Sequence, residues 1–222
     1  MRIVSDGEQK RGKILETACA VFVEKGYHKA TFVEMGKRGK FNPALINFHF
    51  RSKDNLYCAI WHRLKEQVEA NWPIDGNLDA DAAPTERLRA HVQASLGQHS
   101  DKRTASFIRI RLQESVSPTG LLDAELEKRS ETHRTHMRSL IGELLGEAAT
   151  DSDIDLCEMS IISQFSITRP PKPDGSAPPK KRRKSAEFPK AEIDRLTDHI
   201  TAFSLGGIKG IRQIIAQRKE QS

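Results

Sequence analysis

Residues 30–57 read ATFVEMGKRGKFNPALINFHFRSKDNLY, and their pattern predicts two short helices joined by a tight turn and followed by the start of a third. Thr31 stands where a cap of the first helix is expected, with Glu34 three residues later as in a capping box. Gly39 is expected to end this helix, because glycine tolerates the sharp turn that the chain makes next. A helix of about two turns therefore precedes the turn.

The second helix of this stretch begins at Asn42 and Pro43. Asparagine is a strong N-cap, and proline fits the first helical position because its missing amide hydrogen is not needed there. The helix is predicted to run from Pro43 to about Phe50. Two helices joined by a turn of about three residues form the geometry that places the second helix in the major groove of DNA. The small or polar groups left around its surface are Asn42, Ala44, Asn47 and His49.

The same residues resemble the DNA-binding signature of the TetR family of bacterial transcriptional regulators. They are preceded at the family's usual distance by RGKILETACAVFVEKGYHKAT, residues 11–31, and the resemblance covers about residues 10–64. The motifs KGY, HF and SK follow one another in the family's order. The sequence departs from the family pattern in the turn, where Gly39-Lys40 replaces Ala-Gly, and at Arg51, where glycine is usual.

The resemblance implies a transcriptional repressor, with activation as the alternative sign of regulation. Such a protein binds a palindromic operator as a homodimer and is released when a small-molecule inducer occupies its C-terminal domain. Pro43, Ala44 and Asn47 are expected to face bases. Thr31, His49 and Lys53 match positions of the family that touch phosphates or flank them, and Asn42 is a further DNA-binding candidate.

Two later segments resemble the ligand-binding half of the TetR subgroup whose best-known member regulates efflux-related genes in response to antibiotics. They are HRTHMRSLIGELLG at residues 133–146 and HITAFSLGGIKGIR at residues 199–212. Neither segment identifies the operator, the inducer or the regulated genes.

The chain of 222 residues has a formal net charge of +6 that is unevenly distributed. Residues 1–60 hold 11 Lys and Arg against 6 Asp and Glu, and residues 172–184 hold 6 against 1. Positive charge in the first zone is what a DNA-binding surface needs, because cations replace the counterions of the phosphates. The second zone contains Lys180–Lys184, which we interpret as a solvated basic loop in preference to a nuclear import signal.

Apolar residues recur with helical periodicity through the rest of the chain. The helix after the predicted DNA-binding pair starts at the cap Ser52 and runs to about Trp72, where Pro73 stops it. Residues 1–9 carry no such pattern and are expected to form an arm. The sequence predicts further helices over residues 10–25, 85–99, 121–145, 153–168 and 191–216, and another around residues 107–112. The expected fold class is therefore all-α.

The expected domain boundary follows the second of the two DNA-binding helices. Residues 1–52 are predicted to form a three-helix helix-turn-helix domain, and residues 53–222 a helical domain for ligand binding and dimerisation. Within the second domain, residues 169–189 hold 6 of the 10 prolines. This composition indicates a Pro-rich basic loop.

Candidate ligand contacts come from two predicted helices. Arg109, Arg111 and Glu114 carry charges at helical spacing, which indicates either an exposed salt-bridged face or polar contacts in a cavity. Phe165 is the apolar candidate for the same role. The exposed face is the preferred interpretation of the three charges, and the ligand role is the alternative.

The last predicted helix contains three glycines where alanine would be more stable. Each glycine inside a helix costs about 1 kcal/mol relative to alanine, so close approach of a second helix is the simplest explanation. Packing within the chain alone is the alternative. We therefore expect two helices of each chain to form a four-helix dimer interface. Its candidate residues are Ile162, Phe203, Gly207, Gly210 and Ile211.

No arrangement of residues in the sequence points to an enzyme or to a cofactor. A nucleophile with a base, a phosphate-binding glycine loop and a carboxylate-rich metal cluster are all lacking. His133 and His136 lie three residues apart and could share a metal ion. Since no carboxylate stands at a matching spacing, a solvated face is the preferred interpretation of this pair.

The N-terminus shows no signal-peptide pattern, and no apolar run approaches about 18 residues. The protein is therefore expected to be cytoplasmic, with no membrane partner. Two classes of DNA-binding protein remain. The preferred one is the ligand-responsive repressor, and the alternative is a ligand-insensitive DNA-binding or architectural protein.

Overall fold

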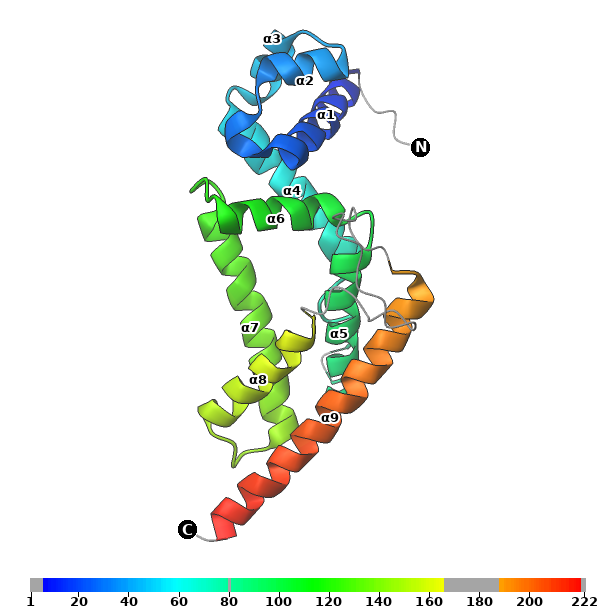
Figure 1. The fold of residues 1–222 in the computed structure, drawn as a ribbon, viewed down its shortest axis with the longest axis vertical. Helices are drawn as coiled ribbons and strands as arrows, with labels where there is room; N and C mark the ends of the chain where they lie inside the picture. The colour runs from blue at the N-terminus through cyan, green and yellow to red at the C-terminus, as the bar shows by residue number, and fades with distance from the viewer. Residues whose placement is uncertain (1–5, 80, 166–187, 221–222) are drawn as a thin grey trace, which may run out of the picture. The chain divides into compact units, whose positions relative to one another are not determined.

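The computed structural model describes residues 6–79, 81–165 and 188–220. Within these ranges the chain forms nine helices and no strand (Figure 1), which confirms the all-α class. The basic loop at Lys180–Lys184 lies outside the described residues. The helices are α1 (Asp6–Lys29), α2 (Phe32–Gly39), α3 (Pro43–Phe50), α4 (Lys53–Asn71), α5 (Pro84–Ser100), α6 (Ala105–Val116), α7 (Asp123–Leu145), α8 (Asp151–Phe165) and α9 (Lys190–Glu220).

The chain packs into two compact units. The first comprises the chain up to Val68 together with Arg103–Leu126, and the second comprises Glu69–Lys102 and the chain from Glu127 onward. Each unit has its own cluster of buried apolar side chains. These units are defined by packing, whereas the boundary expected after residue 52 concerns function, so that boundary stays a prediction.

The first unit buries aromatic rings from α1, α4 and α6. Phe22 meets the ring of Tyr57 edge-on at 5.0 Å between centroids, and Trp61 stacks on Phe107 at 4.7 Å. The Tyr57 hydroxyl donates a 2.6 Å hydrogen bond to the buried carboxylate of Glu114. A buried carboxylate needs such donors, because it has lost its contacts with water.

The N-terminal helix begins earlier than the sequence pattern indicated. α1 starts at Asp6, so the expectation of an arm is wrong for residues 6–9. The first turn carries an ion pair of 2.5 Å between Asp6 and Lys10, and a carboxylate also suits a helix N-terminus. Gly26 interrupts the helix with φ 77, near the end that the sequence predicted, and one further turn follows it.

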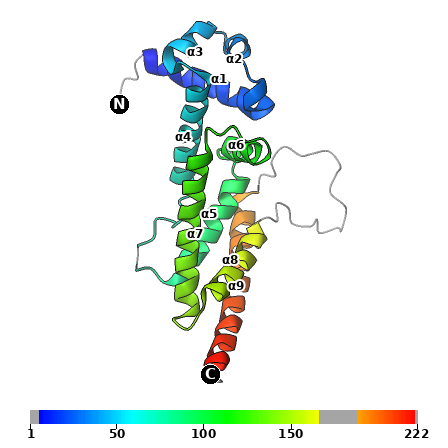
Figure 2. The ribbon, with the colours of Figure 1, turned by 90° about the vertical axis from the view of Figure 1, so that its left-hand side faces the viewer.

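The second unit is built mainly from α5, α7, α8 and α9. Helix α9 runs beside α5, as both views show (Figures 1 and 2). Gly97 of α5 leaves room for the indole ring of Trp72, which a Cβ atom at that position would overlap. Trp72 also donates a 2.9 Å hydrogen bond to Asp101. The buried apolar residues of this unit include Leu88, Val92, Met137, Leu140, Ile141, Ile161, Ile200 and Ile208.

Most helix ends lie within a few residues of their predicted positions. Helix α4 begins after Ser52, whose hydroxyl accepts a 3.0 Å hydrogen bond from the amide of Asn55, as expected of a cap. Helix α8 begins at Asp151, and α9 extends to Glu220, four residues beyond the predicted end. None of the described helices combines the length and the apolarity that crossing a membrane requires.

Candidate nucleic-acid interface

Both short helices of the N-terminal unit have the caps that the sequence predicted. The Thr31 hydroxyl accepts a 3.3 Å hydrogen bond from the amide of Glu34 at the start of α2. The Asn42 side-chain oxygen accepts a 2.9 Å hydrogen bond from the amide of Ala44 at the start of α3. Pro43 occupies the first position of α3. These caps satisfy amides that a helix N-terminus otherwise leaves without partners.

The turn between α2 and α3 depends on close packing at Gly36. A Cβ atom there would lie 2.8 Å from the carbonyl oxygen of Phe41 and from Cγ of Pro43, so a larger residue would force the helices apart. The Phe41 amide donates a 3.0 Å hydrogen bond to the Gly36 carbonyl. Lys40 caps α2 in the left-handed conformation, with φ 53 and ψ 49, a position that glycine usually occupies.

Helix α3 divides its side chains between the core and solvent. Ile46 and Phe50 are buried against the rest of the unit. Ala44, Asn47 and Phe48 are exposed, and Phe48 is 80% accessible to solvent. The apolar residues of this helix therefore do not share one face. The exposed face thus combines one amide with apolar groups.

The sequence before and after this helix is rich in positive charge. Residues 35–53 contain five Lys and Arg and no Asp or Glu. Arg38 pairs with Glu24 at 2.6 Å. Among the described residues, Lys37, Lys40 and Arg51 form no ion pair with a carboxylate within 4.0 Å. Three cations on each chain are therefore free to meet phosphates.

Arg51 caps the other end of α3 in an unusual conformation. Its φ of 64 and ψ of −41 lie where glycine is favoured, and its amide donates a 2.9 Å hydrogen bond to the Asn47 carbonyl. A non-glycine residue held in a sparsely populated region costs about 1–3 kcal/mol. Both departures from the TetR pattern, Lys40 and Arg51, thus place a cation at positive φ.

The remaining candidates for phosphate contacts are held by neighbours. The Lys53 amine lies 4.4 Å from the ring centroid of Tyr27 and donates a 3.4 Å hydrogen bond to the His28 carbonyl. Burial lowers the pKa of Lys53, and the nearby Asp54 carboxylate opposes this effect. The ring of His49 is half-buried and meets Phe48 edge-on at 5.2 Å.

Three residues of this surface were absent from the sequence-based candidates, namely Phe48, Lys37 and Lys40. A signal for Phe48 was present, because it follows Ala44 by four residues and therefore shares its face of the helix. The two lysines could have been found from the lack of any acidic residue between positions 35 and 53.

The candidate ligand contacts do not belong to one unit. Arg109, Arg111 and Glu114 lie on α6 in the first unit, whereas Phe165 ends α8 in the second. Both arginines are exposed. Glu114 is buried, and besides the Tyr57 hydroxyl it accepts hydrogen bonds from the amide and hydroxyl of Thr119. A ligand role for these residues stays a prediction.

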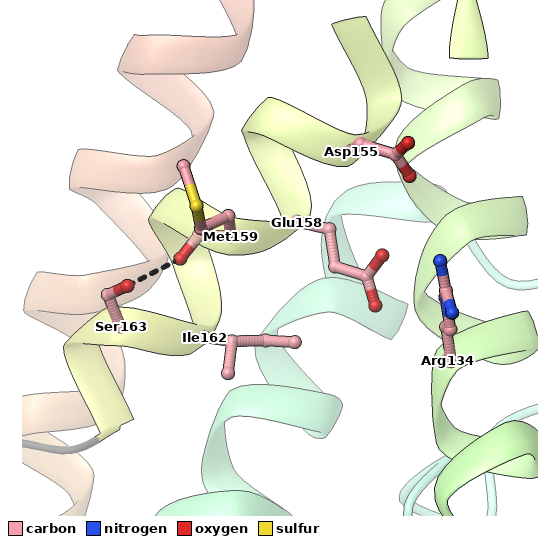
Figure 3. Close-up of a pocket in the computed structure, with 6 residues that line it drawn as sticks. All are labelled: Arg134, Asp155, Glu158, Met159, Ile162 and Ser163. Atoms are coloured by element: carbon pink, nitrogen blue, oxygen red, sulfur yellow. Dashed lines mark hydrogen bonds between the residues drawn. The ribbon is translucent and has the colours of Figure 1, made fainter. Parts of the chain in front are cut away.

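A hollow of about 390 Å³ lies between α7 and α8 in the second unit (Figure 3). Arg134 extends from α7 toward the carboxylate of Glu158 on α8. The Ser163 hydroxyl donates a 2.7 Å hydrogen bond to the Met159 carbonyl. The lining combines a cation, carboxylates and apolar side chains from Arg134, Asp155, Glu158, Met159, Ile162 and Ser163.

Two strips of apolar side chains on α8 and α9 remain uncovered. On α8 the strip consists of Leu156, Met159 and Ile162, all of which are exposed. On α9 it includes Phe203, which is 66% exposed, and Ile214. The glycines Gly206, Gly207 and Gly210 lie on the same face, and an added Cβ atom would meet nothing within 4 Å at any of them.

Three histidines gather inside the second unit. The rings of His91 on α5 and His136 on α7 stack at 5.5 Å, and the ring of His133 lies 6.3 Å from that of His91. Nδ1 of His91 and Nε2 of His136 are buried without a hydrogen-bond partner among the described residues. The solvated face expected for His133 and His136 is therefore wrong for His136. In the described part of the chain, neither these histidines nor any other group of three or more His, Cys, Asp or Glu side chains is placed so that it could hold a metal ion.

Two family models match this chain. Residues 84–208, more than half of the chain, match the model described as HTH-type transcriptional dual regulator CecR, C-terminal domain. Residues 14–60 match the model described as bacterial regulatory proteins, tetR family. Over 87 residues the chain is 32% identical to the HTH-type transcriptional activator FasR of Mycolicibacterium smegmatis, and the matched segment spans 39% of each protein.

Solved structures share the fold across almost their whole length. A putative fatty acid metabolism regulator of Clostridium perfringens gives a TM-score of 0.62 at 18% identity, covering 88% of this chain and 97% of that one. AibR in complex with isovaleryl coenzyme A and operator DNA gives 0.60 at 19% identity, with the same coverage. At these identities the likeness shows the fold alone. The two family models establish that this chain is a DNA-binding transcription regulator of the TetR family.

Proposed function

We propose that this protein is a ligand-responsive transcriptional repressor that binds a palindromic operator as a homodimer and leaves it when a small-molecule inducer binds. The exposed face of α3, with the cations around it, is the observation that carries this proposal. Residues 1–52 serve DNA binding, and residues 53–222 serve ligand binding and dimerisation. We assign the protein no reaction and no cofactor, and we place it in the cytoplasm, where bacterial DNA lies.

On the DNA, base edges meet Pro43, Ala44 and Asn47, because these residues lie at the start and on the outer side of α3. Thr31 and Asn42 already accept one hydrogen bond each through their side-chain oxygens. Their hydroxyl and amide hydrogens remain available as donors to phosphate oxygens. His49 and Lys53 lie beside the phosphate backbone of the same DNA half-site.

Dimerisation is supported by the uncovered strips on α8 and α9. Ile162 and Phe203 contribute exposed apolar area, whereas Ile211 is half-buried against the chain's own core and contributes only its remaining exposed part. Gly207 and Gly210 allow a second helix to approach closely. Among the described residues, a Cβ atom added at either glycine would meet nothing within 4 Å, which favours a partner helix over packing within the chain. Two copies of the chain would bring these strips together as a four-helix interface and supply two recognition helices for successive major grooves.

A ligand acts only if it binds the DNA-free state more tightly than the DNA-bound state. AibR holds isovaleryl coenzyme A together with operator DNA, and the Clostridium relative is named for fatty acid metabolism. Coenzyme A thioesters are therefore our first probes. Arg109, Arg111, Glu114 and Phe165 stay our candidate contacts, and a ligand that reaches Glu114 must replace the hydrogen bonds of this carboxylate.

Selection of genomic DNA fragments on the purified protein tests the DNA-binding part. We expect a small set of fragments that share an inverted repeat. Asn47→Ala should relax the selected sequence at one base pair in each half-site, by about 1–3 kcal/mol in discrimination. Recovery of fragments without any shared sequence would reject a specific operator and favour an architectural protein.

In vitro transcription from a selected fragment then gives the sign of regulation. The proposal predicts that the protein lowers transcription and that an effective ligand restores it. FasR is named an activator and CecR a dual regulator. Increased transcription on addition of the protein would therefore contradict the repressor role and indicate an activator. Titration with isovaleryl coenzyme A and a series of other acyl thioesters checks release. If no ligand changes operator affinity, the ligand-insensitive alternative is favoured.

A further inference from the structure

A highly exposed phenylalanine ring lies on the outer face of α3. Phe48 is 80% accessible to solvent, and Ala44, one helical turn earlier, is also exposed. Residues four positions apart lie above one another on a helix. Ala44 and Phe48 therefore form an apolar strip along the side of α3 that points away from the core.

The surroundings of this strip indicate what covers it. The nearest unpaired charges in the sequence are Lys37, Lys40 and Arg51, and no acidic residue stands between positions 35 and 53. Cations of this kind favour a polyanion over an apolar protein surface or a second copy of the same charge. Within the major groove, the apolar group that base pairs offer is the C5 methyl of thymine.

We propose that Ala44 and Phe48 read thymine methyl groups, with the Phe48 ring packed against the C5 methyl of one thymine in each half-site. The inference rests on the proposed binding of α3 in the major groove and adds the chemistry that it recognises there. The four-residue separation corresponds to about 6 Å along the helix. The two side chains therefore contact bases one or two steps apart.

Asn47 lies between the two apolar residues on the exposed surface. Its amide is suited to adenine, which presents one acceptor and one donor in the major groove. A half-site read by this helix is therefore expected to contain a thymine beside an A·T pair. Phe48 can recognise thymine only through an apolar contact with the C5 methyl group of the base, because the phenylalanine ring has no hydrogen-bonding atom.

Uracil substitution in the selected operator tests the inference. Uracil keeps the base pairing of thymine and removes only the C5 methyl. Replacing thymine with uracil at one or two positions in each half-site should weaken binding of the wild-type protein. The expected loss of affinity is about fourfold per half-site, which corresponds to the transfer free energy of one buried methyl group. Phe48→Ala should itself bind the thymine operator more weakly, and it should lose the preference for thymine at the Phe48 position.

Val116→Ala is the matched control, because Val116 is 85% exposed in the same unit but lies on α6. It should bind the operator as the wild type does and keep the full uracil effect. Circular dichroism and thermal unfolding test whether Phe48→Ala folds. We expect that it does, because the Phe48 side chain is exposed to solvent and is not part of the core. Phe48→Leu retains an apolar side chain and should retain part of the thymine preference.

The inference is overturned if uracil has no effect on wild-type binding at any position of the half-site. It is equally overturned if Phe48→Ala keeps the wild-type preference for thymine, or if its only defect is altered self-association. In all three cases the wild-type protein still binds its operator. These results therefore remain distinct from failure of the proposed function, in which the wild-type protein selects no shared sequence at all.

Discussion

At the scale of single residues, His91 shows how burial sets the charge state of a side chain. Its side chain is buried on α5, with Nδ1 lacking a hydrogen-bond partner among the described residues. Burial lowers the pKa of His91 to about 3, and the neighbouring rings of His136 and His133 add to this effect. Phe165 of α8 also lies against the ring. The folded chain therefore holds His91 in its neutral form.

Acid should destabilise the protein through this residue. The pKa of His91 is depressed in the folded state relative to about 6.5 in the unfolded state, so the unfolded chain binds the proton more tightly. Stability is complete above about pH 6.5 and is lost as the pH falls toward about 3. The loss at about pH 5.5 is on the order of 1 kcal/mol for this group. Thermal unfolding at several pH values measures it.

His91→Leu removes the titrating group and should flatten the dependence of stability on pH in this range. His62→Leu is the control, because His62 is exposed on α4 and loses little solvent on folding. It controls for the exchange of a histidine for a leucine at an exposed position. Equal slopes for His91→Leu and the wild type would assign the acid sensitivity to other residues.

The residue scale also shows where sequence patterns are sufficient. The caps Thr31 and Asn42 were predictable because a cap depends on amides two or three residues away. The burial of Glu114 was not, since its partner Tyr57 lies 57 residues earlier in the chain. The exposure of Phe48 required knowing which side of α3 faces the core, and an apolar residue alone does not reveal that.

At the scale of elements, the order and type of the helices followed from apolar periodicity, while some ends did not. Helix α1 begins at Asp6, in a polar first turn without an apolar pattern, where ion pairing with Lys10 contributes instead. Helix α9 continues to Glu220 through residues with few apolar side chains. Periodicity detects the part of a helix that packs, and it misses turns that extend into solvent.

The glycines of α9 carry a prediction for this element. Gly207→Leu should give monomers with weak operator affinity, because the added side chain separates the proposed partner helices and each half-site then binds alone. The fold of the chain itself should persist, since a Cβ atom at Gly207 meets nothing within 4 Å and leucine favours a helix more than glycine does. Analytical ultracentrifugation and operator titration measure the two effects.

Arg212→Leu places the same side chain on another side of α9, at an exposed position. It should remain dimeric. A dimeric Gly207→Leu protein would place the interface elsewhere. Unfolding of Gly207→Leu, in contrast, would show that the chain itself fills the space beside this glycine.

At the scale of the whole molecule, the chain is divided in a way that its order in sequence does not reveal. The first unit gathers Arg103–Leu126 with the N-terminal part of the chain, although the 34 residues of Glu69–Lys102 separate them. The contact of Trp61 with Phe107 is one of the links. Such pairings are long-range and leave no periodic signal in the sequence, so the packing units could not be predicted from it. The functional boundary expected after residue 52 stays a prediction.

The positive charge of the N-terminal part of the chain is expected to bind DNA phosphates, and substitutions of Arg51 test this role. Its positive φ costs about 1–3 kcal/mol, which glycine would avoid. Arg51→Gly should therefore raise the unfolding temperature while weakening binding to every DNA sequence. Because a dimer carries two copies, the slope of log affinity against log salt should become shallower by about 2, at about 0.9 for each lost phosphate contact.

Arg51→Gln separates the two effects, because it removes the charge and keeps a side chain at positive φ. It should show the same shallower salt dependence without the gain in unfolding temperature. Arg51→Lys should preserve most of the salt dependence. Operator titrations between about 50 and 200 mM salt measure these slopes. If Arg51→Gly keeps the wild-type slope, Arg51 makes no phosphate contact, and the strain at this residue has no explanation in DNA binding.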